Sequence, residues 1–190
     1  YHEAGHSLVA AQTKGADPVH KVTIIPRGRA LGVTMQLPID EKHGYSKTYI
    51  EGRLAILMGG RAAEELIFNE LTTGAGNDIE QATQIARKMV CEWGMSERIG
   101  PLTFGNKTEE IFLGREMSQK RDYSDEVSKK IDEEISMFVK NAEKQSDKIL
   151  SQHIDKLHKL ANALLEYESI SGLDMHHVIH DDPIVRLAST

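Results

Sequence analysis

The chain opens with YHEAGHSLVAA (residues 1–11), a stretch in which small and apolar residues recur at helical spacing. Ala4 and Leu8 lie one helical turn apart, and the pattern predicts a helix over residues 1–13. The small side chains of Ala4 and Gly5 leave room for another element to pack closely against this helix. A second element is therefore expected to pack closely against this N-terminal helix.

The same stretch carries two histidines and a glutamate at H-E-x-x-H spacing. Residues i and i+4 lie on one face of a helix, so His2 and His6 can direct imidazole nitrogens at one ion. Glu3 lies beside that face, where it can hold a zinc-bound water and take its proton. The motif therefore predicts two zinc ligands and the base of a peptide hydrolase.

A catalytic zinc needs a third protein ligand and an open fourth position. The extended H-E-x-x-H-x-x-G-x-x-H pattern does not occur, because its glycine position holds Val9 and its last histidine position holds Gln12. The third ligand must therefore come from further along the chain, as a carboxylate or a distant histidine.

One source of carboxylates is a helix predicted over residues 46–69. At about 100° per residue, Glu65 falls in the middle of the apolar face of this helix and Glu64 at the edge of that face. A buried carboxylate needs a partner. It can be a zinc ligand, a group that orients a ligand histidine, or one half of an ion pair with Arg61.

The other source is Asp78, in TTGAGNDIEQAT (residues 72–83), where the glycines let the backbone approach a site closely. An acidic residue in a first helical turn is also common without any metal, because it suits the helix dipole. The same dipole disfavours a cation there. Residue chemistry alone therefore leaves Glu65 and Asp78 both open as the third ligand.

The remaining patterns predict further helices and one hairpin. Short β-rich runs at 20–26 and 30–37 are separated by the turn PRGR, which suits a pair of neighbouring strands. Residues 40–46 and 94–121 are expected to form loops. A helix capped by Asn77 with Glu80 in a capping box is expected next, with its buried stripe at Ile79, Ala82, Ala86, Met89, Val90 and Trp93.

Apolar residues at helical spacing in the C-terminal part predict two amphipathic helices. The first begins near Asp122, and the two are separated at Ser146–Asp147. Leu164 and Leu165 are both expected on the apolar face of the second helix. A short last helix is expected after a capping box of Ser171 and Asp174. The chain has three histidines here that are expected to be solvated rather than to bind metal: His176, His177 and His180.

Composition limits the classes of protein. The chain has 190 residues, a net charge of −6 and 39% hydrophobic residues, so it can bury a core and does not offer a general nucleic-acid surface. Its one cysteine, Cys91, excludes an intrachain disulfide and is expected to be buried. The apolar runs are too short for a membrane span. Because the motif begins at residue 2 with no start methionine, we expect a part of a longer protein.

Several segments, taken in order, resemble the peptidase domain of the FtsH family of membrane-anchored, ATP-dependent zinc metalloproteases. They are HEAGH, DPVHKVTIIPRGRALGVT, GGRAAEEL, TTGAGNDIEQAT, GMSE followed by GPLTFG, and FLGRE. The resemblance implies that His2, His6 and Asp78 bind one zinc ion and that Glu3 is the catalytic base. It implies that the two glutamates of GGRAAEEL, Glu64 and Glu65, are supporting residues.

The resemblance also implies the architecture. The fold is expected to be mainly α-helical with a small β-sheet near the active site and C-terminal amphipathic helices. The expected zinc metallopeptidase domain covers residues 1–180, with a catalytic core at 1–121 and a helical part at 122–180. Residues 181–190 are expected to form a disordered tail. Transmembrane segments and an AAA ATPase module, the only part that binds ATP, are expected in the longer protein.

The partners implied are unfolded or membrane-protein polypeptides and five further copies of the protein in a homo-hexamer, with no nucleic acid. The longer protein is expected in a bacterial inner membrane or its organelle equivalent, with this domain on the cytoplasmic or equivalent side and itself soluble. The strand around Gly32–Gln36 is expected to pair with an extended substrate. Two alternatives stay open: an ATP-independent zinc peptidase with Glu65 as ligand, and a non-catalytic ring-assembly module.

Overall fold

The computed structural model describes residues 1–26, 32–37, 44–104 and 123–184. The fold is mainly helical with one small sheet, as the sequence predicts. The elements in chain order are α1 (His2–Gln12), β1 (Val19–Thr23), β2 (Val33–Gln36), α2 (Lys47–Phe68), the 3₁₀ helix η1 (Thr73–Ala75), α3 (Gly76–Cys91), α4 (Asp125–Gln152), α5 (Ile154–Tyr167), β3 (Ser169–Ser171) and α6 (Gly172–His180).

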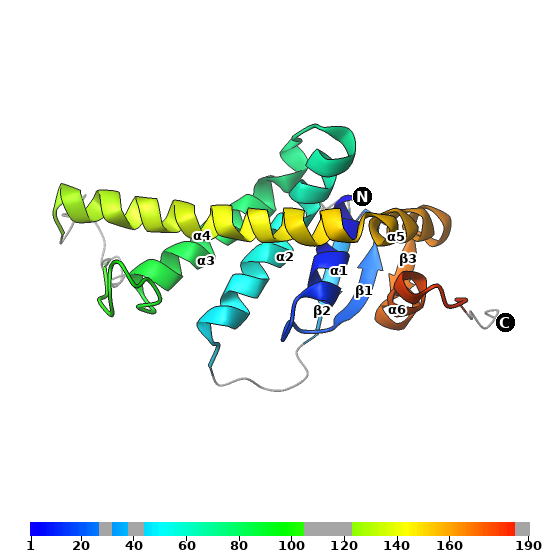
Figure 1. Ribbon diagram of the computed structural model, residues 1–190, viewed down its shortest axis with the longest axis horizontal. Helices are drawn as coiled ribbons and strands as arrows, with labels where there is room; N and C mark the ends of the chain where they lie inside the picture. Colours follow the sequence, from blue (N-terminus) through cyan, green and yellow to red (C-terminus); the bar gives the residue numbers. More distant parts are fainter. Residues whose placement is uncertain (27–31, 38–43, 105–122, 185–190) are drawn as a thin grey trace, which may run out of the picture.

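Helix α2 occupies the centre of the molecule, between α1 and the long helix α4 (Figure 1). It begins at Ser46, whose side chain accepts a hydrogen bond from the Tyr49 backbone N–H, and it ends at Asn69 in the left-handed conformation. Its central turns are buried nearly all the way round, because α1 packs on one side and α3 and α4 on the other. This two-sided burial sets the position of every functional residue on α2.

The three strands form an antiparallel sheet in the order β2-β1-β3. Val22 in the central strand lies opposite Thr34 of β2 and Ile170 of β3. The predicted pairing of the first two strands is confirmed, while most of the PRGR turn lies outside the described residues. Since β2 is at one edge of the described sheet, its outer side is available for further strand pairing.

Two hydrophobic clusters stabilise the fold. The first joins α1, β1, β3, α5, α6 and the C-terminal end of α4, through Leu150, with one side of α2. The second joins α3 and the rest of α4 with the other side of α2. The first includes Leu8 and Val22, and the second includes Leu54 and Met89, all fully buried. Helix α2 contributes to both clusters and so fixes α1 relative to α3.

The start of α3 differs from the prediction. Its N-cap is Ala75 and Asn77 lies inside the first turn, so Asn77 does not cap it. The preceding turn is η1, and the side chain of Thr72 caps it by accepting a hydrogen bond from Gly74 N. The capping function therefore falls to a threonine upstream, because the chain enters α3 through a 3₁₀ turn.

The predicted buried stripe of α3 is right in its centre and wrong at its ends. Ala82, Ala86, Met89 and Val90 are buried, whereas Ile79 and Trp93 are 36% and 44% exposed. Trp93 lies beyond the last helical residue, so helical spacing no longer governs where its side chain points. Cys91 is buried and free, as predicted.

The division of the C-terminal helices also differs. Helix α4 continues through Ser146–Asp147, and the break comes at His153. Ser146 does not cap a helix, because its hydroxyl lies 2.6 Å from Ala55 O of α2 and 3.0 Å from Ala142 O of its own helix. The residue that suggests a boundary in the sequence instead fastens α4 to α2.

Other predictions for the C-terminal part are confirmed in some residues and wrong in others. Leu164 is buried, but its neighbour Leu165 is 72% exposed, because successive residues of a helix point about 100° apart. The capping box of Ser171 and Asp174 at the start of α6 is confirmed. Asp181 ends α6 and pairs with Lys159 at 2.6 Å, while the end of the predicted tail lies outside the described residues.

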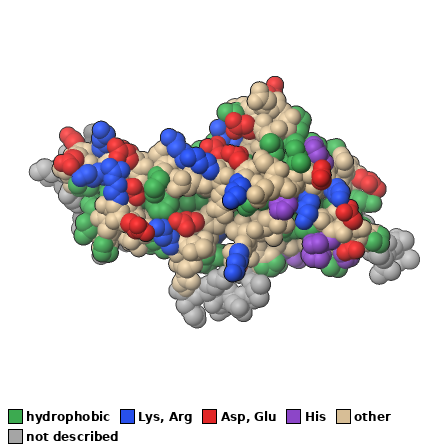
Figure 2. Space-filling model, viewed as in Figure 1, with side chains coloured by type: hydrophobic (Ala, Val, Ile, Leu, Met, Phe, Trp, Pro, Cys, Tyr) green, Lys and Arg blue, Asp and Glu red, His purple; other side chains and the backbone are tan. Residues whose placement is uncertain are grey.

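The face shown in Figure 2 mixes acidic and basic side chains along α4, and histidines gather toward the end formed by α5 and α6. Ion pairs such as Lys130–Glu126, 2.8 Å, and Arg98–Glu133, 2.7 Å, account for part of this alternation. Within the described residues, none of the helices combines the length and the apolar character that a membrane crossing requires.

Replacing Ser146 by alanine tests the link between α4 and α2. We expect the free energy of unfolding to fall by about 1 kcal/mol, because a buried hydrogen bond is lost without a large cavity. Denaturant titration of the metal-free chain measures the change, and Ser151→Ala on an exposed part of α4 is the matched control. Equal stability of the two variants would show that the Ser146 contact contributes nothing.

Candidate metal centre

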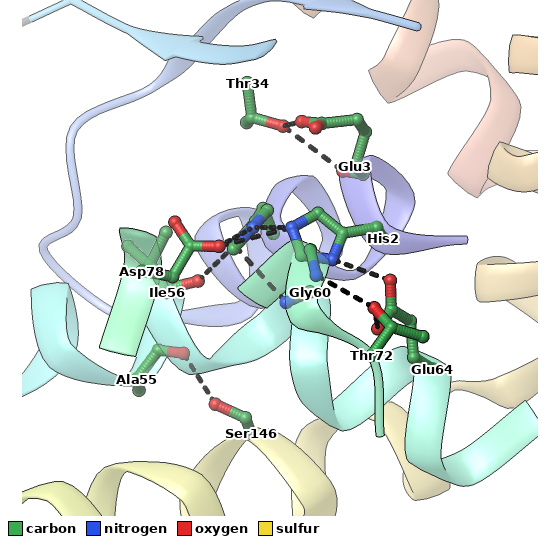
Figure 3. A network of polar contacts seen from close by, with 12 residues as sticks. His2, Glu3, Thr34, Ala55, Ile56, Gly60, Glu64, Thr72, Asp78 and Ser146 are labelled. Carbon is green, nitrogen blue, oxygen red and sulfur yellow. Dashed lines mark hydrogen bonds and ion pairs between the residues drawn. The ribbon is translucent and has the colours of Figure 1, made fainter. Parts of the chain in front are cut away.

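Helices α1 and α3 bring three ligand atoms to one point. His2 and His6 lie on successive turns of α1. Asp78 extends toward His2 from the first turn of α3 (Figure 3). His2 Nε2 lies 3.0 Å from His6 Nε2 and 3.2 Å from Asp78 Oδ2, and His6 Nε2 lies 3.4 Å from the same oxygen. Among the described residues these three form the one group placed to share a metal ion.

Glycines allow this arrangement. A Cβ atom on Gly5 of α1 would lie 2.3 Å from Gly59 O of α2, so the two helices touch through their backbones. A Cβ atom on Gly60 would lie 2.5 Å from His6 Nε2 and 2.6 Å from His2 Nε2. Both imidazoles therefore lie directly over Gly60, and a side chain there would occupy their place.

The other ring nitrogen of each histidine has a hydrogen-bond acceptor. His6 Nδ1 lies 2.7 Å from Ile56 O, and His2 Nδ1 lies 3.1 Å from Glu64 Oε1. A carbonyl oxygen only accepts, so His6 Nδ1 carries the proton, although Gly60 N also lies 3.3 Å from it. A carboxylate oxygen of Glu64 is likewise an acceptor, which places a proton on His2 Nδ1 as well. In both rings the lone pair is thus on Nε2, which faces the cluster.

Glu64 is itself held in place. Thr72 Oγ1 donates to Glu64 Oε2 at 2.9 Å and accepts from Gly74 N at 3.1 Å. The α2–α3 connection therefore fixes the carboxylate that orients His2. The role of Thr72 is not predicted above. Its position before the Gly-rich turn, where threonine favours capping, is the signal in the sequence that points to it.

The cluster attracts positive charge. With Nδ1 of each ring carrying a proton, the two Nε2 atoms and a carboxylate oxygen converge on a position that favours a cation, which is either a metal ion or a proton held between His2 and Asp78. Burial is the largest influence on His2 and lowers its pKa, but the hydrogen bond to Asp78 and the charges of Glu64, Glu3 and Asp78 raise that pKa overall. Burial raises the pKa of Asp78, but hydrogen bonds and charges of both histidines hold it well below its usual range.

The geometry fits zinc. Zinc bound by histidine nitrogen and carboxylate oxygen has bonds of about 2.0–2.2 Å, and a tetrahedron of that size has edges of roughly 3.3 Å. The three edges of the cluster are 3.0, 3.2 and 3.4 Å. Three protein ligands are also the number that a catalytic zinc has, whereas a structural zinc has four.

The two glutamates of α2 differ from the prediction. Glu65 was expected in the middle of the apolar face but is exposed, whereas the half-buried Glu64 contacts His2. The ion pair suggested for Arg61 is formed with Glu143 of α4 at 2.9 Å. The error arises because α2 is buried on two sides, so its apolar residues do not define one arc.

Glu3 lies apart from the three ligand atoms. Its carboxylate points toward β2, where Thr34 Oγ1 donates to Glu3 Oε2 at 2.8 Å (Figure 3). A Cβ atom on Gly32 would lie 2.6 Å from Glu3 Cγ, so this glycine leaves room for the glutamate. The sheet edge thus holds the residue that the H-E-x-x-H motif predicts as base.

The three C-terminal histidines lie on α6 and form a separate group. The rings of His176 and His180 are stacked with centroids 4.1 Å apart, and His180 Nδ1 contacts His176 O at 2.8 Å. His177 Nδ1 is buried without a partner among the described atoms. Among the described residues, the ligand atoms of these histidines do not come close enough together to share a metal ion.

Comparison with known proteins identifies the family. The model of peptidase family M41 matches residues 1–178, which is most of the chain. The chain belongs to peptidase family M41. The predicted resemblance to the FtsH family is thereby confirmed, and the helical fold with a small sheet is the fold of an M41 peptidase domain.

Curated relatives agree with the family assignment, and each is named ATP-dependent zinc metalloprotease FtsH. The protein of Acidobacterium capsulatum is 58% identical over 179 residues, 94% of this chain and 28% of the relative. That of Magnetococcus marinus is 54% identical over 183 residues, 96% of this chain and 27% of the relative. The chain therefore spans less than a third of the length of these relatives.

Proposed function

We propose that this M41 chain is the proteolytic part of an ATP-dependent zinc metalloprotease, with His2, His6 and Asp78 as the ligands of one zinc ion and Glu3 as the base. The convergence of Nε2 of two imidazoles and one carboxylate oxygen, with Nδ1 of each imidazole placed against an acceptor, carries the proposal. The names of the relatives support the same activity.

Each residue has a defined part in peptide hydrolysis. A zinc ion bound by the three ligands supplies Lewis-acid polarisation of a peptide carbonyl and makes water more acidic. Ile56 O and Glu64 keep Nε2 of His6 and His2 free of protons and pointed at the ligand position. Glu3 accepts the proton of the attacking water at its carboxylate and returns it to the leaving amine. Glu64 is a supporting residue.

The edge strand β2 gives the peptide a place to bind. It is unpaired on its outer side within the described sheet and it carries Thr34, which contacts Glu3. An extended polypeptide that pairs with β2 would bind through its backbone, which suits substrates of many sequences. Unfolded and membrane-protein polypeptides are the substrates we propose.

Membership of the family supports a proposal for the wider assembly. We propose that the chain works within a membrane-anchored homo-hexamer, in a bacterial inner membrane or its organelle equivalent, with this domain on the cytoplasmic or equivalent side. ATP is proposed to bind to another segment of the longer protein. The alternative of an ATP-independent peptidase with Glu65 as ligand is not favoured, since Glu65 is exposed and lies outside the cluster of His2, His6 and Asp78. No observation favours a non-catalytic ring module.

Zinc content tests the proposal. We expect about one zinc per chain in the wild type and a loss of most of it in Asp78→Ala, because two imidazoles alone bind zinc weakly. Metal analysis after dialysis against a weak chelator measures this. Glu80→Ala, an exposed acidic residue of the same helix, is the matched control and should keep its zinc.

The other outcomes decide between the alternatives. Full zinc in Asp78→Ala together with loss in Glu65→Ala would establish the other ligand and refute the proposed one. A folded wild type that takes up no zinc would favour the ring-assembly module. A wild type with zinc but no hydrolysis of unstructured peptide would leave the metal centre standing and remove the proteolytic part of the proposal.

A further inference from the structure

The edge strand and the helix that carries the metal ligands are joined through one side chain. Thr34 of β2 places its hydroxyl 2.8 Å from Glu3 Oε2 and 3.3 Å from the backbone carbonyl of Glu3. A hydroxyl has one hydrogen, so the shorter contact to the charged oxygen is the stronger one. The orientation of Glu3 thus depends on a residue of the sheet rather than on its own helix.

Gly32 contributes from the same side of the chain. A Cβ atom there would lie 2.6 Å from Glu3 Cγ and 2.7 Å from Glu3 Oε1. Positions two apart in an extended segment face the same way, so Gly32 and Thr34 both face Glu3. One position leaves the space that the glutamate fills, and the other supplies the hydrogen bond that holds its carboxylate.

We propose that Thr34, with Gly32 beside it, is a positioning residue for the Glu3 carboxylate in peptide hydrolysis. The inference rests on the proposed function, in which Glu3 is the base. It adds a residue of β2 that acts through Glu3 and has no contact with the metal ligands among the interactions of the described residues. A peptide paired along β2 and the base would then be aligned by the same strand.

The geometry also allows a purely structural role, in which Thr34 only ties β2 to α1. The two roles differ in what they change. A structural tie affects stability and leaves the rate constant of the folded, zinc-loaded chain intact. A positioning residue affects kcat and leaves zinc content and KM nearly unchanged, because neither metal binding nor peptide pairing uses its hydroxyl.

The test compares Thr34→Val with Thr34→Ser, using an internally quenched, unstructured peptide and the zinc-loaded chain. We expect kcat of Thr34→Val to fall about 10- to 100-fold, as for the loss of one hydrogen bond to a charged group. KM should stay within about two-fold and zinc content should not change. Thr34→Ser keeps the hydroxyl and should recover kcat to within about three-fold of the wild type.

Two further measurements sharpen the result. A crystal structure of Thr34→Val should show the Glu3 carboxylate displaced from its position against β2, a readout independent of turnover. Thr83→Val makes the same chemical change in α3, where the hydroxyl donates to Ile79 O at 2.8 Å. This control should keep the wild-type kcat.

The failures are distinguishable. If Glu3→Gln is inactive while Thr34→Val keeps the wild-type kcat, or changes KM alone, the positioning role is wrong and the proposed function stands. The same holds if Thr34→Ser is as slow as Thr34→Val, or if Glu3 keeps its position in the valine variant. If the zinc-loaded wild-type chain does not hydrolyse the peptide, or if Glu3→Gln hydrolyses it at the full rate, the assignment of Glu3 as base is wrong. The proposed function then falls, and the inference falls with it.

Discussion

Gly60→Ala is expected to weaken zinc binding by at least about 100-fold, the upper end of what partners of metal ligands contribute. An added Cβ would lie 2.5 Å from His6 Nε2 and 2.6 Å from His2 Nε2, far inside contact distance. Both rings would have to move, and the backbone of α2 cannot retreat because α3 and α4 pack behind it. Displacing either nitrogen by several tenths of an ångström removes the three-ligand arrangement.

Titration with a chromophoric zinc chelator measures the affinity of the Gly60→Ala variant. Circular dichroism of the metal-free chain shows whether the helices remain formed, so that loss of the site can be separated from unfolding. Gly76→Ala is the matched control, because Gly76 is helical and an added Cβ there has no neighbour within 4 Å. Wild-type zinc affinity in Gly60→Ala would show that the imidazoles do not lie over Gly60.

Glu3→Gln is expected to lower the rate of peptide hydrolysis about 100- to 10,000-fold while zinc content stays at the wild-type level. Glutamine keeps the shape of the side chain and an oxygen that can accept from Thr34, but it cannot take a proton from water. The cluster of His2, His6 and Asp78 does not include Glu3, so metal binding should not depend on its charge.

Hydrolysis of an unstructured quenched peptide and zinc analysis on the same preparation check both parts of this expectation. Glu80→Gln makes the same substitution at an exposed position of α3 and should behave as the wild type. A Glu3→Gln variant that loses its zinc would point to a structural role for the charge. One that retains full activity would place the base elsewhere.

The N-terminal stretch allowed two residues of the candidate site to be predicted, because H-E-x-x-H on a helix places two candidate ligands on one face by spacing alone. The third ligand could not be chosen by physical reasoning, since Asp78 and Glu65 both lay on predicted helices. That choice depended on how α1, α2 and α3 cross. The contacts of Gly5 and Gly60 set how closely α1 approaches α2, and they are long-range contacts that no local pattern encodes.

Errors in the predicted elements have a common origin. An assumed single apolar face, at about 100° per residue, predicted that Glu65 points toward the core. Helix α2 is instead buried on two sides, and Glu65 lies beyond the last of its buried residues. Ser146 suggested a helix boundary because serine favours caps, but here a tertiary bond to Ala55 O occupies its hydroxyl. In both places tertiary packing decided what a local preference left open.

The membership of the two hydrophobic clusters has a mechanical consequence for the metal centre. Helix α1 belongs to one cluster and α3 to the other, and α2 and α4 contribute side chains to both. A zinc ion held by His2, His6 and Asp78 would add a cross-link between the two halves of the molecule built on these clusters, beside the packing of α2 and α4 that already joins them. Metal occupancy would then set how cooperatively the halves unfold, so that catalytic competence and the integrity of the chain would be lost together.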